Sequence, residues 1–160
     1  PIFTKQLILV NSGGYPKKNE KGNIGFKLAS IPVVGDVLVK FTPRALIRKS
    51  IEDVYSDKAK VNEVLVQRYF DLLLREGNRN ATLDIFKQRI IFGSSEKIKN
   101  IQTPTLIIWG EDDQLIDVSN AYLFEKDIQN SQLVIIPKTG HVPMEENPLA
   151  FLDALKKFIF

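Results

Sequence analysis

The stretch TPTLIIWGEDD, residues Thr103–Asp113, decides the fold class of this chain. Its centre, Thr105–Trp109, is an almost continuous apolar run that ends at a glycine. Such a run is typical of a strand covered on both faces, as in a parallel sheet. Two similar runs, at Leu7–Val10 and Leu133–Ile136, predict two more strands. We expect the three strands to be parallel neighbours in their chain order.

Helical spacing of apolar residues follows each of the last two strands. One helix is predicted at Val118–Glu125, starting near Asp117, and a terminal helix at Pro148–Phe160. Strands that alternate with helices in this way predict an α/β fold with a parallel sheet.

The long stretch between the first and second strands also has helical spacing. We expect Thr42 to cap one helix there, with Pro43 in its first turn, and Asn62 to cap the next. A third helix is predicted at Asn80–Ile91. This helical middle is therefore an insertion into the sheet. In the helix after Asn62, apolar residues recur at helical steps, and in the third helix three residues are expected to face inward. The first set is Val64, Leu65, Tyr69, Leu72 and Leu73, and the second is Ala81, Ile85 and Phe86.

Composition excludes several classes of protein. The 160 residues are 44% hydrophobic, with a formal net charge of +3 and basic residues spread along the chain, which argues against a nucleic-acid partner. There is no cysteine and one histidine, so disulfides and zinc sites rich in cysteine or histidine are not expected. No apolar run is long enough for a membrane helix, and no signal peptide is evident. A soluble, cytoplasmic protein is the expectation.

Two carboxylates and the one histidine each follow a predicted strand. Asp112 and Asp113 come directly after the central strand, and His141 follows the last one. Functional groups gather at the carboxyl ends of parallel strands, so we expect these residues to meet. An aspartate could fix the tautomer of the imidazole, which could then act as a general base. The alternatives are a helix-capping turn for the aspartates and a surface histidine.

The order of these residues, acid first and histidine second, matches the Ser…Asp…His order of α/β-hydrolases. The segments TPTLIIWGEDDQLIDV and LVIIPKTGHVPMEENPLAFLDALKKFI resemble the C-terminal part of that superfamily. They are similar to its capped members, which include meta-cleavage product hydrolases, epoxide hydrolases, haloalkane dehalogenases and esterases. The segment PIFTKQLILVNSGGYP resembles the strand that leads into the cap.

The resemblance assigns roles to individual residues. The W-G-x-x-D pattern of the superfamily ends on Asp113, which makes it the expected catalytic acid, with Asp112 as second choice. The Gly-His pattern falls on His141, the expected base, and the acidic-Asn-Pro stretch on Glu146–Pro148. Asp117 is a departure, because superfamily members often have proline there.

The resemblance also implies how the chain is divided. Residues 1–16 would be a sheet strand of the hydrolase core, residues 17–100 a helical cap or lid, and residues 101–160 the last strands and helices of the core. The nucleophile elbow G-x-S-x-G and an HGGG-type oxyanion segment do not occur in the sequence. In the superfamily layout both would precede Pro1, so the chain resembles a fragment that carries two members of a catalytic triad.

The expected function is therefore that of an α/β-hydrolase fragment. The whole enzyme would cleave a small apolar ester, or a C–C bond in a carbonyl compound, through a nucleophile–His141–Asp113 triad with the nucleophile outside this chain. Epoxide and halide substrates stay open, and no metal or organic cofactor is implied. The chain alone is expected to be inactive, and its sheet to be covered by the missing N-terminal half or by a homo-oligomer. The alternative is an inactive, truncated hydrolase-like module whose exposed sheet binds a partner or a second copy.

Two polar residues after the first strand have two possible roles. Asn11 and Ser12 could line an active-site pocket, but turn chemistry is the simpler explanation of both.

Overall fold

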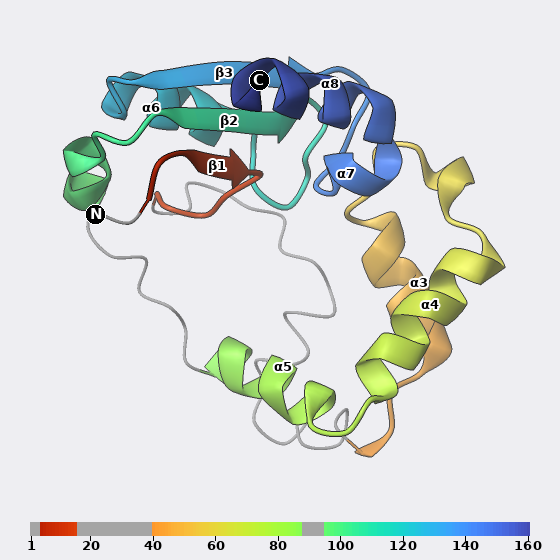
Figure 1. Cartoon of the computed structure of the whole chain (residues 1–160). Helices are drawn as coiled ribbons and strands as arrows, with labels where there is room; N and C mark the ends of the chain where they lie inside the picture. The colour runs from red at the N-terminus through yellow and green to blue at the C-terminus, as the bar shows by residue number, and fades with distance from the viewer. Residues whose placement is uncertain (1–3, 16–39, 88–94) are drawn as a thin grey trace. The chain divides into compact units, whose positions relative to one another are not determined.

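The computed structural model of the chain describes residues 4–15, 40–87 and 95–160 (Figure 1). These residues form two compact units. The first unit contains residues 4–15, 54–57 and 95–160, and the second contains residues 40–53 and 58–87. Four residues from the middle of the insertion, 54–57, thus belong to the first unit.

The first unit is built on a parallel sheet of three strands in the order β1-β2-β3 (Figure 1). Its strands are β1 (Leu7–Val10), β2 (Thr105–Gly110) and β3 (Ser131–Ile136). Thr105 pairs with Leu7 on one side and Ser131 on the other. All six residues of β2 are buried, as its continuous apolar run predicts. The expected strands, their direction and their order are confirmed.

Helices cover both faces of this sheet. Helix α6 (Ser119–Asp127) packs against Ile107 and Trp109 on one face, and α8 (Pro148–Ile159) packs against Leu106 and Ile108 on the other. Alternate residues of a strand point to opposite faces, which explains this division. The first unit is completed by the short helices η2 (Ser95–Asn100) and α7 (Pro143–Glu146).

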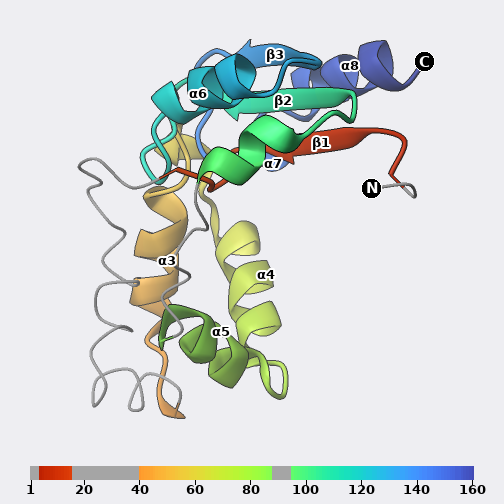
Figure 2. The same ribbon diagram turned by 90° about the vertical axis from the view of Figure 1, so that its left-hand side faces the viewer.

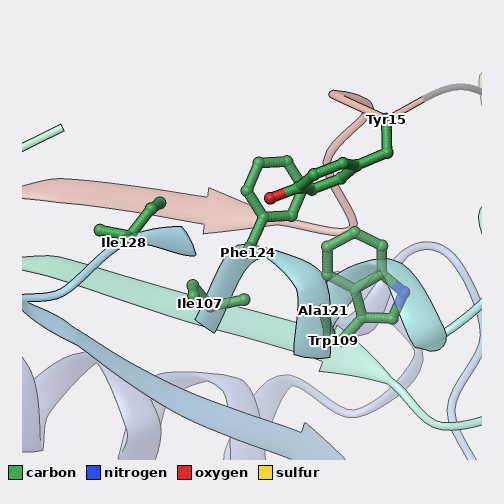
Figure 3. Close-up of a cluster of buried hydrophobic side chains, with 6 residues drawn as sticks. All are labelled: Tyr15, Ile107, Trp109, Ala121, Phe124 and Ile128. Carbon is green, nitrogen blue, oxygen red and sulfur yellow. The ribbon is translucent and has the colours of Figure 1, made fainter. Parts of the chain in front are cut away.

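The α6 side of the sheet holds a core cluster of six buried residues (Figure 3). The ring of Tyr15 meets that of Phe124 edge-on, with centroids 4.9 Å apart. The Tyr15 hydroxyl lies 2.9 Å from the carbonyl oxygen of Leu123 and 3.1 Å from a carboxylate oxygen of Asp127. Burial, reinforced by Asp127, raises the pKa of Tyr15. The cluster fastens the loop after β1 to α6. Its members are Tyr15, Ile107, Trp109, Ala121, Phe124 and Ile128.

The second unit is helical (Figure 2). It contains α3 (Arg44–Glu52), η1 (Lys58–Lys60), α4 (Glu63–Leu74) and α5 (Asn78–Lys87). Helix α4 contacts both α3 and α5. Asn62 caps α4 as predicted, because its side-chain oxygen accepts a hydrogen bond of 2.9 Å from the backbone of Leu65.

Two details of the predicted helices are wrong, namely the N-cap of α3 and the inward orientation of Ala81. The N-cap of α3 is Pro43 and not Thr42, since the extended ψ of 132° at Pro43 delays the helix by one residue. Val64 is 80% exposed and Leu72 is 42% exposed, while Val66 is buried. Apolar residues lie on most sides of α4, so their spacing did not identify its buried face. Ala81 is exposed as well.

Part of the third predicted helix lies outside the described residues. Helix α5 spans Asn78–Lys87 in the described part of the chain, whereas the predicted helix spans Asn80–Ile91. The side chains of Ile85 and Phe86 also lie outside the described part. None of the helices in the described ranges is both long and apolar enough to cross a membrane.

Candidate active site

Each strand of the sheet ends in a loop that carries one polar residue of the candidate site. Asn11 follows β1, Asp113 lies three residues after β2, and His141 lies five residues after β3. Because the strands are parallel neighbours, their carboxyl ends lie along one edge of the sheet. Three residues that are far apart in sequence are thereby brought together.

Asp113 and His141 contact each other directly. The Nδ1 atom of His141 lies 2.8 Å from Oδ2 of Asp113. The side chain of Asp113 is fully buried, and that of His141 is 22% exposed. The expected meeting of the acid and the histidine is confirmed as geometry. With Asp113 as a carboxylate, this atom of the imidazole must donate, which fixes the tautomer of neutral His141.

The carboxylate of Asp113 has a donor at each of its oxygens. Oδ1 accepts hydrogen bonds from the backbone N–H groups of Leu115, at 2.8 Å, and Ile116, at 3.0 Å. Oδ2 accepts from Asn11 Nδ2 at 2.6 Å in addition to His141. Such donors stabilise a buried negative charge and hold the carboxylate in one orientation.

Asn11 has a larger part in the site than its sequence position predicts. It is only 4% exposed, and its backbone is in the left-handed region at φ 42°. Its Nδ2 donates to Asp113, and its Oδ1 lies 3.4 Å from the backbone nitrogen of Gly110. Asparagine tolerates this backbone region better than most residues. The available signal was a polar residue directly after a predicted strand, but turn chemistry was the simpler explanation of it.

Two glycines allow close backbone contacts at the site, because Gly110 lets the end of β2 approach the loop after β3, and Gly140 lets that loop approach the backbone of Val54 and Ser56. A Cβ atom at Gly110 would lie 2.0 Å from the carbonyl oxygen of Gly140. A Cβ atom at Gly140 would lie 2.3 Å from the carbonyl oxygen of Val54. These contacts leave no room for a side chain, which explains physically why glycine precedes both the acid loop and the histidine.

Asp112, the second choice for the acid, has a different partner. Its Oδ2 accepts a hydrogen bond of 2.6 Å from Ser56 Oγ, and its backbone N–H donates to Thr139. Asp113, and not Asp112, therefore contacts the imidazole. Ser12 makes a turn contact, from its Oγ to the carbonyl oxygen of Val10 at 3.3 Å.

The arrangement suits proton transfer at the second nitrogen of the imidazole. Among the described residues, Nε2 of His141 has no hydrogen-bond partner. A neutral imidazole that donates through Nδ1 has a lone pair at Nε2, and this atom can accept a proton from a nucleophile or from water. The buried carboxylate would stabilise the imidazolium that forms. No group of acidic or histidine side chains suited to a metal ion occurs in the part of the chain that the structure describes.

A family model described as the alpha/beta hydrolase fold matches residues 53–148 of this chain, which is more than half of its length. The chain belongs to the alpha/beta hydrolase fold family. The match includes both the Asp113 loop and the His141 loop, so the family that the sequence motifs indicated is confirmed.

Individual hydrolases are similar over parts or all of the chain. The chain is 25% identical over 159 residues to an uncharacterized hydrolase, YugF, of Bacillus subtilis, covering 99% of this chain and 58% of that protein. It is 29% identical over 113 residues to the 2-hydroxy-6-oxo-6-(2'-aminophenyl)hexa-2,4-dienoic acid hydrolase of Metapseudomonas resinovorans, covering 68% of this chain and 39% of that one.

A solved meta-cleavage product hydrolase from Pseudomonas fluorescens IP01 superposes with a TM-score of 0.76 at 22% identity. The superposition covers 96% of this chain and 55% of that structure, which supports the shared fold. The chain thus spans between 39% and 58% of the length of these hydrolases.

Proposed function

We propose that this chain supplies the acid and the base of a nucleophile–histidine–aspartate triad, with the nucleophile located outside the chain. Asp113 is the acid and His141 is the base. The observation that carries the proposal is the 2.8 Å contact between Nδ1 of His141 and the buried carboxylate of Asp113. The reaction is the hydrolysis of a small ester or of a C–C bond next to a carbonyl group.

Each residue has a defined step in this mechanism. Nε2 of His141 accepts the proton of the attacking nucleophile, and Asp113 stabilises the resulting imidazolium through Nδ1–H. His141 then returns the proton to the leaving group, and it activates water in the same way when the covalent intermediate is hydrolysed. The chain's own groups thus hold and move the proton, while the covalent bond forms at the external nucleophile.

Two observations support a nucleophile outside the chain. None of the eight serines of the sequence lies in a G-x-S-x-G pattern, which the strained turn of a nucleophile elbow requires. The hydrolases to which the chain is similar are also considerably longer. The relative from Metapseudomonas is named for a dienoic acid that carries a 6-oxo group. This name supports keeping the hydrolysis of a C–C bond beside a carbonyl group as one of the two candidate reactions. In this proposal, the helical insertion at residues 17–100 serves as the lid.

The test compares the chain with the longest protein that its coding region encodes. We expect only the longer protein to hydrolyse p-nitrophenyl butyrate or a 2-hydroxy-6-oxo-dienoic acid, and to be labelled at serine by a fluorophosphonate probe. His141→Ala should lower kcat/KM by about 10⁴-fold or more, since the base and the nucleophile act as a unit. Lys138→Ala, at an exposed residue of the same loop, is the matched control, and its kcat/KM should stay within about twofold of the wild-type value.

Full activity in His141→Ala would refute the assigned base. Labelling of the 160-residue chain itself would refute an external nucleophile. If the longest encoded protein is neither active nor labelled, the alternative of an inactive hydrolase-like module is the better account.

A further inference from the structure

A second buried carboxylate, that of Glu146, lies beside the candidate site and has no step in the proposed mechanism. Glu146 is the last residue of α7 and is only 4% exposed. Its Oε2 accepts hydrogen bonds from the backbone N–H groups of Gly140, at 2.6 Å, and Ser56, at 3.2 Å. Its Oε1 accepts from the backbone N–H of Asp57 at 2.7 Å. Three charge-assisted hydrogen bonds therefore end on one buried side chain.

Two of these donors belong to the segment 54–57, with the sequence VYSD, which we call the strap. The strap lies between α3 and η1 in sequence, yet it packs within the first unit. The carbonyl oxygen of Val54 accepts a hydrogen bond of 2.7 Å from the backbone N–H of His141. Ser56 Oγ donates to Asp112, and the Tyr55 hydroxyl donates to Glu145 at 2.9 Å. Every residue of the strap is thus bonded to a loop of the site or to α7.

The backbone around His141 is held from two directions by these contacts. Val54 holds the amide of His141, and Glu146 holds the amide of the preceding residue, Gly140. A Cβ atom at position 140 would lie 2.8 Å from the backbone nitrogen of Ser56, so the strap and the loop are in close contact. The Asp113 contact orients the ring of His141, but the position of its backbone depends on the strap.

We infer that Glu146 is a positioning residue, which fastens the strap to the His141 loop and thereby aims Nε2 of His141 at the nucleophile. Its effect on turnover rests on the proposed function. Its effect on the loop does not, because the three hydrogen bonds exist whether or not His141 is the base. The two effects can therefore be measured separately.

The test substitution is Glu146→Gln, which keeps the shape of the side chain but replaces one acceptor oxygen by an NH₂ donor. At least one of the amides of Gly140, Ser56 and Asp57 then loses its acceptor. We expect hydrogen exchange at one or more of these amides to accelerate by roughly 10- to 100-fold, the range for loss of a hydrogen bond to a charged group. In the longer, active protein we expect kcat to fall by about 10²-fold, because a displacement of about 1 Å in a catalytic group has that cost. KM should stay within about twofold.

Glu145→Gln is the matched control, since it removes the same charge from the adjacent residue of α7 and leaves an oxygen to accept from Tyr55. It should change neither the exchange of the three amides nor kcat. If Glu146→Gln does not fold, Glu146→Asp keeps the charge but is one methylene shorter. It should then show faster exchange at Gly140 or Asp57, with a smaller loss of kcat.

Unchanged exchange at all three amides in both Glu146 variants would overturn the inference. Equal losses in Glu145→Gln and Glu146→Gln would overturn it too, because a general effect of charge would then suffice. Faster exchange combined with full activity of His141→Ala would contradict the proposed function and leave the fastening of the strap in place.

Discussion

The side-chain amide of Asn11 connects the loops after all three strands. It donates to Asp113 at 2.6 Å, lies 3.5 Å from the carbonyl oxygen of Gly140, and its oxygen lies 3.4 Å from the backbone nitrogen of Gly110. Its NH₂ group can only donate, and the carboxylate that it faces can only accept while it is charged. Asn11 therefore supports both the position and the charge of Asp113.

Replacement of Asn11 by aspartate tests this role. Asn11→Asp would place a second carboxyl group at hydrogen-bond distance from Asp113, and such a pair shares one proton instead of carrying two charges. We expect the pH profile of kcat/KM in the longer protein to gain an ionisation that the wild type lacks. In the folded state the carboxyl pair keeps one proton at a pH where the unfolded chain has lost it. The free energy of unfolding of the variant should therefore fall as pH rises, by roughly 3 kcal/mol at pH 8.

Asn11→Gly is the matched control for the backbone, since glycine accepts the φ of 42° without strain. It removes the amide without adding a charge, so it should not add an ionisation to the pH profile. A wild-type pH profile in Asn11→Asp would contradict the role assigned to the amide.

The helices and strands of the chain differ in how well the sequence predicts them. The strands were predictable because each is a short, apolar run, although only β2 is buried along its whole length, whereas β1 and β3 are partly exposed. The start of α8 was predictable because Asn147 caps it and Pro148 suits its first position. Helix α4 was placed by the Asn62 cap, but its buried face was not, since the energy of burial depends on neighbours that local spacing does not reveal.

The start of helix α6 should contribute a pH-dependent part of the stability of the fold. Asp117 precedes the helix, and its carboxylate accepts hydrogen bonds from the side chain and then the backbone of Ser119, which lower the pKa of Asp117 from 3.8. A lowered pKa in the folded state gives stability that is present above pH 3.8 and is lost as pH falls through the folded value.

We expect Asp117→Ala to be less stable than the wild type at pH 7 by about 0.5 kcal/mol, a small loss for a side-chain hydrogen bond at a helix start because the carboxylate is largely exposed. The difference should shrink below pH 3.8. Urea unfolding at several pH values measures it. Glu125→Ala, on the exposed side of the same helix, is the control. A difference that is constant with pH would show that the charge of Asp117 has no part in it.

At the scale of the whole molecule, the candidate site is assembled from segments that are far apart in sequence. The motifs around Asp113 and His141 were evident because each lies in the loop that follows an apolar strand. The strap was not predictable, because nothing in the pattern of VYSD distinguishes it from the helical residues on either side. Its place becomes evident only when Glu146 is seen to be buried against it.

The extent of the chain determines which experiments can test its function. In the proposed function the nucleophile lies outside this chain, which spans 58% of the Bacillus relative, so assays of turnover use the longest protein that the coding region encodes, whereas the acid–histidine pair can be studied in the chain itself. The chain has one histidine, so its imidazole signals come from His141 alone.

The most direct test of the central claim is the tautomer of neutral His141, measured by ¹⁵N NMR in the wild type and in Asp113→Asn. The wild type should carry its proton on Nδ1, facing the carboxylate. In Asp113→Asn, the side-chain oxygen would stay with the N–H groups of Leu115 and Ile116, so the new NH₂ would face Nδ1 and move the proton to Nε2. The same tautomer in both proteins would contradict the claim that Asp113 orients His141.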